Sequence, residues 1–160
     1  MNMKLAELFG RVPEGFAEME FPSHLATDSR DVMEGGAFVA LEGEKTDGHK
    51  YIPQALERGA GLLIVREGKK PEGVNVPVIE LENPERDLAD IASRKLQAHD
   101  LHDVIAITGS VGKTTTRAAL QKVLSPHFTL HAPERSFNTL IGCTATIMAM
   151  PLETEIVILE

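Results

Sequence analysis

The segment Val104–Leu120 reads VIAITGSVGKTTTRAAL, and it constrains the fold more than any other part of the chain. A short apolar run ends at Thr108, two glycines and a lysine follow, and a helix-forming stretch continues to Pro126. This order predicts a fully buried strand, a flexible turn and a helix over residues 115–126. The amides at the start of such a helix point outward, and the helix dipole favours anions there. We therefore expect a cradle for phosphate groups.

The residue types in the turn suit a nucleotide. Gly109 and Gly112 allow the backbone to approach oxygen atoms closely, and Lys113 supplies a cation for the β- and γ-phosphates. Thr114 stands where a hydroxyl usually ligates Mg²⁺. The general phosphate-loop pattern G-x-x-x-x-G-K-[ST] is incomplete, because Ile107 occupies the position of its first glycine. The alternative is a glycine-rich turn with a solvated lysine, and a phosphate loop alone does not name a reaction.

The remaining pattern is that of an α/β protein with parallel sheets. Short apolar runs predict strands at 37–41, 61–65, 76–81 and 155–160. One helix is expected around Ile52 and stops at Gly59, a second follows Asn83 and Pro84, and a third covers 139–150. We place a boundary between 99 and 100, so that residues 1–99 form one domain and residues 100–160 open a second.

Composition excludes several classes of function. Sixteen basic residues against 24 acidic ones give a net charge of -8, which argues against a nucleic-acid or anionic-membrane surface. The single cysteine, Cys143, forbids an intrachain disulfide and is expected to be a packed thiol. No signal peptide or membrane-spanning run is present, so we expect a cytoplasmic protein.

Three stretches resemble the Mur ligases, the ATP-dependent enzymes that assemble the peptidoglycan stem peptide. They are AITGSVGKTTT at 106–116, the long segment at 26–65, and SFNTLIG at 136–142. The sequence departs from the family pattern at Thr139, within the last stretch, and at Cys143-Thr144, directly after it. The resemblance implies a small N-terminal domain that binds a uridine-nucleotide substrate, followed by the first part of a P-loop ATPase domain. It also implies an acyl-phosphate intermediate and two cofactors, ATP and Mg²⁺.

The resemblance also implies the roles of individual residues. Lys113 would be catalytic, and Thr114 and Glu160 would bind the metal. The ATP-binding positions would be Gly109, Ser110, Val111, Gly112, Lys113, Thr114, Thr115 and Asn138. The UDP-binding positions would be Ser29, Arg30, Lys45 and Thr46.

Simpler interpretations of these positions stay open. Ser29 and Arg30 could form a capped turn with a surface salt bridge, and Thr46 could belong to a plain loop. Asn138 could cap the helix that follows it. Glu160 could be a solvated glutamate at the end of a strand.

The branch of the family that adds D-alanyl-D-alanine to UDP-N-acetylmuramoyl-tripeptide fits the loop and the SFNTLIG stretch. The DGHKYIPQA stretch at 47–55 favours the sister branch, which adds the third stem-peptide residue. A non-catalytic UDP-binding module is the alternative from another class. Since the family's later catalytic residues are absent, we expect a fragment that is inactive alone and that self-associates through an incomplete sheet edge.

Overall fold

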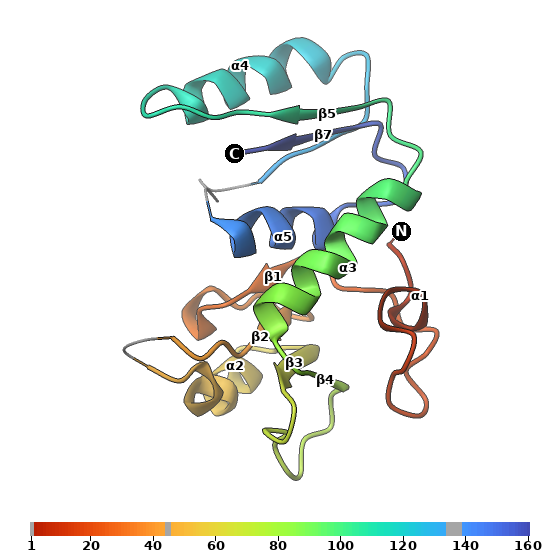
Figure 1. The fold of residues 1–160 in the computed structure, drawn as a ribbon, viewed down its shortest axis with the longest axis vertical. Coiled ribbons are helices and arrows are strands. Elements are labelled where there is room, and N and C mark those ends of the chain that lie inside the picture. The colour runs from red at the N-terminus through yellow and green to blue at the C-terminus, as the bar shows by residue number, and fades with distance from the viewer. Residues whose placement is uncertain (1, 44–45, 134–138) are drawn as a thin grey trace.

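The computed structural model describes residues 2–43, 46–133 and 139–160, which form two separate parallel sheets (Figure 1). The first sheet has the order β1-β2-β3-β4 and the second has the order β5-β7-β6. The strands of the first are β1 (Leu25–Ala26), β2 (Ala37–Val39), β3 (Leu62–Arg66) and β4 (Val78–Leu81). Those of the second are β5 (Asp103–Ala106), β6 (Leu130–His131) and β7 (Ile156–Leu159). All pairings within both sheets are parallel.

Helices connect the strands and cover the sheets. The α-helices are α1 (Leu5–Phe9), α2 (Ile52–Glu57), α3 (Pro84–Ala98), α4 (Lys113–Leu124) and α5 (Leu140–Ala149). Two short 3₁₀ helices, η1 (Ser29–Asp31) and η2 (Gly48–Tyr51), follow β1 and precede α2. None of the helices in the described ranges has the length and apolar character needed to cross a bilayer.

The predicted parallel α/β architecture is confirmed, with most elements within a few residues of their expected positions. The Asn83 side chain accepts a hydrogen bond from the Arg86 amide and caps α3, as the sequence indicated. Thr139 caps α5 in the same way through the Gly142 amide. Three short elements were not predicted from the sequence, namely α1, β1 and β6, which are only five, two and two residues long.

The first sheet is apolar on both faces, as expected for a parallel sheet covered on each side. Ala37, Val39, Leu62 and Ile64 lie in a cluster with residues of α1, α3 and α5. The alternate residues of the same strands, such as Phe38 and Leu63, pack with Ile52 and Ala55 of α2. The period of two along each strand therefore divides the core into two layers.

Helix α5 belongs to the second half of the sequence but packs against the first sheet. It contacts α3 and β1, and its residues Ala145, Ile147 and Met148 join the apolar cluster of the first sheet. In Figure 1, α5 and α3 lie between the two sheets. One hydrophobic core therefore includes residues from both halves of the chain.

A buried lysine forms hydrogen bonds at the C-terminal end of α5. Lys95 of α3 is 2 % exposed, and its ammonium donates hydrogen bonds to three oxygens, each at 2.7 Å. These acceptors are the Asn2 side chain and the carbonyls of Met148 and Met150. The last carbonyls of a helix lack intrahelical partners, so the ammonium satisfies two of them. Lys95 thereby links the N-terminus, α3 and α5.

The prediction that the strand before the glycine-rich loop is fully buried was wrong. Residues of β5 are mostly exposed, and Val104 retains 45 % of its surface. The cause is topology, because among the strands of the described ranges β5 pairs only with β7 and forms one edge of the second sheet. The central strand β7 is the buried one, with Ile156, Val157 and Ile158 at 3 % exposure or less.

Candidate active site

The glycine-rich loop leaves β5 and enters α4 at an exposed end of the second sheet. The Ile107 amide still bonds to the Leu159 carbonyl at 2.8 Å, so the loop begins where the ladder ends. Gly109 and Gly112 have φ values of 139° and 85°, which are conformations that side-chain-bearing residues rarely adopt. The first bond of α4 runs from the Thr116 amide to the Gly112 carbonyl. The loop thus opens onto the start of the helix, as the sequence pattern predicts.

The residues of the loop face solvent. Ser110, Val111 and Thr115 are exposed, and Val111 at the tip is 90 % exposed. Lys113 folds back across the loop, and its ammonium donates a hydrogen bond to the Gly109 carbonyl at 2.7 Å. A cation therefore lies over an exposed turn at a helix N-terminus, an arrangement that suits a phosphate chain.

Glu160 lies at the end of β7 with its side chain fully buried. Its carboxylate pairs with Arg117 of α4, with 3.0 Å between Oε1 and Nη1, and the Arg117 side chain is only 9 % exposed. Neither carboxylate oxygen has a hydrogen-bond partner within the described part of the chain. The Cys143 thiol donates to the Glu160 backbone carbonyl at 3.1 Å, and burial raises the pKa of that thiol. A solvated glutamate is therefore not what the structure shows.

A cavity of about 590 Å³ lies between the region around η1 and the elements α4, β6 and α5. Thr27, Asp28 and Arg30 line it from the first half of the chain. Gln121, His131 and Thr146 line it from the second half. The His131 Nε2–H donates to the Thr146 carbonyl at 2.9 Å, and burial lowers the pKa of this imidazole.

The predicted UDP-binding residues Ser29 and Arg30 lie in a capped turn. Asp28 accepts from the Arg30 amide and pairs with its guanidinium at 2.6 Å. Hydrogen bonds from the Arg30 side chain and backbone lower the pKa of Asp28 to about 2. Arg30 is exposed and lines the cavity, whereas the buried Ser29 hydroxyl bonds to Gln54 Oε1 at 2.6 Å.

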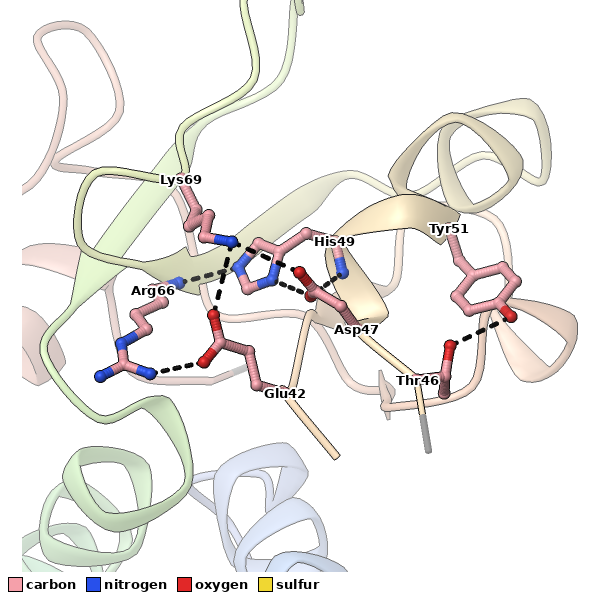
Figure 2. A network of polar contacts seen from close by, with 7 residues as sticks. All are labelled: Glu42, Thr46, Asp47, His49, Tyr51, Arg66 and Lys69. Carbon is pink, nitrogen blue, oxygen red and sulfur yellow. Dashed lines mark hydrogen bonds and ion pairs between the residues drawn. The ribbon is translucent and has the colours of Figure 1, made fainter. Parts of the chain in front are cut away.

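Thr46 lies at the edge of a polar network that fixes the chain before α2 (Figure 2). Its hydroxyl bonds to the Tyr51 hydroxyl at 3.3 Å. Next to it, Asp47 accepts from the His49 amide and from His49 Nδ1, and these bonds lower the pKa of Asp47 to about 2. The predicted positions Lys45 and Asn138 lie outside the described residues.

Glu42, Asp47 and His49 bring three potential metal-ligating atoms within 4.8 Å of one another. Each of these groups already has a protein partner (Figure 2). Arg66 and Lys69 pair with Glu42, Lys69 also reaches Asp47, and the Arg66 amide donates to His49 Nε2. Since two cations compensate the two carboxylates, the cluster is a structural ion-pair network.

Three side chains that shape these sites were not predicted from the sequence. Arg117 follows Lys113 by four residues, so both lie on the same face of α4, and this spacing was the available signal. Asp28 and Gln54 position the predicted pair Ser29 and Arg30. No local pattern could connect Gln54 to Ser29, because 25 positions separate them.

Family comparisons agree with this geometry. The model "Mur ligase family, catalytic domain" matches residues 23–100, and the model "Mur ligase middle domain" matches residues 107–160. The two matches are consecutive, and the second contains the loop, α4 and Glu160.

Individual relatives come from two branches. A UDP-N-acetylmuramoyl-tripeptide--D-alanyl-D-alanine ligase of Bacillus subtilis is 35 % identical over 85 % of this chain. A UDP-N-acetylmuramoyl-L-alanyl-D-glutamate--2,6-diaminopimelate ligase of Chelativorans is 42 % identical over 63 % of it. The chain spans 30 % and 20 % of the lengths of these two relatives.

Solved structures lead to the same family. The MurF ligase of Thermotoga maritima in complex with ADP superposes with a TM-score of 0.62 and 31 % identity. This match covers 86 % of the present chain and 31 % of the Thermotoga chain. Because both family models match in order and the structural match covers most of the chain, the chain belongs to the Mur ligase family.

Proposed function

We propose that this chain supplies the substrate domain and the ATP loop of a ligase that adds D-alanyl-D-alanine to UDP-N-acetylmuramoyl-tripeptide. Residues 1–99 form the substrate domain, and residues 100–160 form the first part of a cytoplasmic ATP-binding domain. The observation that carries the proposal is the exposed loop at 109–112 with the Lys113 ammonium folded over it. The relatives named for this reaction and the ADP complex of the Thermotoga enzyme support it.

The loop residues would hold ATP in distinct ways. Gly109, Ser110, Val111 and Gly112 would offer backbone amides to the phosphates, and Lys113 would compensate their charge. Thr115 and Asn138 complete the proposed ATP-binding set. In this arrangement Lys113 stabilises the phosphoryl group as it moves, which is why we assign it the catalytic role.

The residues at the end of β7 fit a divalent cation. The buried Glu160 carboxylate has two oxygens without hydrogen bonds among the described residues, and hard cations prefer such oxygen ligands. Thr114 and Glu160 would hold Mg²⁺. Bound there, the ion would neutralise charge on the phosphates.

The cavity between the two halves suits a large substrate. Arg30 lines it, and its guanidinium is suited to a diphosphate. Ser29, Lys45 and Thr46 are proposed to complete the uridine-nucleotide site, with Gln54 orienting the Ser29 hydroxyl.

The chemistry follows from the weakness of a carboxylate as an acyl donor. An oxygen of the tripeptide carboxylate attacks the γ-phosphorus of ATP, and ADP leaves. The amine of D-alanyl-D-alanine then attacks the acyl carbon, and inorganic phosphate and a proton leave as the amide forms. The present chain holds the groups for nucleotide binding, and we propose that it does not complete the reaction alone.

Calorimetric titration of the chain with Mg-ADP tests the nucleotide site. We expect Lys113→Met to weaken binding about 10- to 100-fold, because a charged hydrogen bond contributes about 1.5–3 kcal/mol. Lys122→Met is the matched control, since Lys122 lies exposed in the last turn of the same helix. Equal affinities of the wild type and Lys113→Met would reject the site.

The sister ligase remains the second candidate, because a diaminopimelate-adding relative shares 42 % identity with 63 % of this chain. ADP release from the full-length protein separates the two reactions. One assay supplies UDP-tripeptide with D-alanyl-D-alanine, and the other supplies UDP-dipeptide with a diamino acid. Turnover only with the second pair would assign the chain to the sister branch. UDP binding without any ADP binding would indicate a non-catalytic module.

A further inference from the structure

The contact between Arg117 and Glu160 is the most buried ion pair found among the described residues. Its side chains are 9 % and 0 % exposed, whereas the other pairs each have a partner that is at least 28 % exposed. Exposed ion pairs contribute little, but a buried carboxylate is costly unless its charge is compensated. The Arg117 guanidinium therefore contributes far more to stability here than a surface arginine would.

The pairing leaves the carboxylate only partly satisfied. An ionised carboxylate offers about four acceptor positions, and Arg117 Nη1 lies 3.0 Å from Oε1. No hydrogen bond to Oε1 or Oε2 is found in the described ranges. One guanidinium thus offsets the charge and leaves coordinating capacity on both oxygens.

Two cationic side chains of α4 contact different groups. Lys113 and Arg117 are four residues apart, so they lie on one face of the helix. Lys113 turns back to the loop carbonyl of Gly109, whereas Arg117 turns to the end of β7. The two cations consequently serve different partners, the loop and the carboxylate.

We infer that Arg117 is a positioning residue, whose guanidinium holds the Glu160 carboxylate in place and compensates its charge until a divalent cation binds. The inference rests on the proposed role of Glu160 as a metal ligand. In this exchange the divalent cation replaces the guanidinium as the partner of the carboxylate. The buried negative charge is therefore compensated both before and after the cation binds. The exchange also lowers the affinity for the metal, since Mg²⁺ must compete with the guanidinium.

A thermal double-mutant cycle without nucleotide or metal tests the pairing itself. We expect Arg117→Met to lower the melting temperature, because it leaves the buried carboxylate uncompensated. Adding Glu160→Gln to this variant should recover stability, and Arg117→Lys should retain most of it. If Arg117→Met fails to fold but the double variant folds, the uncompensated carboxylate is again identified as the cause. A double variant no more stable than Arg117→Met would overturn the inference.

A Mg²⁺ titration tests the exchange. The readout is the melting temperature of the chain at a fixed, saturating ADP concentration. We expect Arg117→Met to need about tenfold less Mg²⁺ for half-maximal stabilisation, which corresponds to about 1.4 kcal/mol. An unchanged or higher Mg²⁺ requirement would overturn the exchange. Weaker ADP binding by Arg117→Met in metal-free buffer would do so as well, because Arg117 would then act on the phosphates.

Different results would contradict the proposed nucleotide site and the proposed role of Arg117. If the wild-type chain does not bind ADP, the proposed nucleotide site fails. The ligand-free cycle would still measure the coupling between residues 117 and 160. If ADP binds and the cycle is additive, only the role of Arg117 fails.

Discussion

At the scale of single residues, Lys95 shows how one side chain can connect distant parts of the chain. Its ammonium bonds to Asn2 near the N-terminus and to two carbonyls at the end of α5. The sequence places Lys95 on the apolar face of α3, because it follows Leu88 by seven positions and Ile91 by four. Its acceptors could not be predicted, because they are more than 50 positions away. Burial lowers the pKa of Lys95 from 10.5 to about 8.

This pKa shift predicts how stability depends on pH. Below pH 8 both the folded and the unfolded chain carry the proton, and the folded chain bears the full cost of burying the charge. Between about pH 8 and 10.5 the folded chain loses the proton while the unfolded chain keeps it. The contribution of Lys95 to the free energy of unfolding therefore rises through this window.

Lys95→Met should remove that rise. We also expect it to lower the free energy of unfolding at pH 7 by about 2–4 kcal/mol, since buried acceptors lose a charged donor. Urea unfolding followed by circular dichroism at pH 7 and pH 9.5 measures both effects, with Lys122→Met as the exposed control. A Lys95→Met profile with the same rise as the wild type would show that another group causes it.

At the scale of elements, strands were predicted most accurately from the sequence where the run of residues itself determines whether the strand is buried. The runs at 37–41 and 61–65 are apolar on both faces, and both became central strands of a covered sheet. The run before the loop is equally apolar, yet β5 is exposed, because burial there depends on how many strands lie beside it. The site also depends on a side-chain contact between residues far apart in the sequence, because 43 positions separate Arg117 from Glu160.

The exposed edge of β5 carries a prediction about association. Unpaired strand edges recruit other chains, so we expect the mass of this chain to increase with concentration in sedimentation velocity experiments. Val104→Lys should suppress the increase, because a charge on an edge strand opposes pairing. Val123→Lys, on the exposed side of α4, is the control and should associate like the wild type. A wild type that stays monomeric at every concentration would reject the prediction.

At the scale of the whole molecule, the apolar cluster of the first sheet extends into α5. Met148 is fully buried in this cluster, although 67 positions separate it from Leu81 at the end of β4. The boundary expected at residues 99–100 follows the order of the sheets along the sequence. It does not describe the packing of α5, which lies against α3 and β1.

Truncating Met148 should therefore weaken both halves together. We expect Met148→Ala to lower the free energy of unfolding by about 2–5 kcal/mol, the usual cost of removing a large buried side chain. Hydrogen exchange should accelerate in peptides from both β3 and β7. Met33→Ala is the control, because Met33 is 52 % exposed and should change little. Faster exchange confined to β7 would indicate two independent units.

The position of α5 also bears on how members of this family could exchange parts. A chimaera that joins residues 1–99 of this chain to another ligase would receive a foreign helix against β1 and α3. The donor would have to reproduce the surface formed by Ala145, Ile147 and Met148, together with carbonyls for the Lys95 ammonium. Successful recombination is therefore expected to follow the contacts of α5 rather than the junction at residue 100.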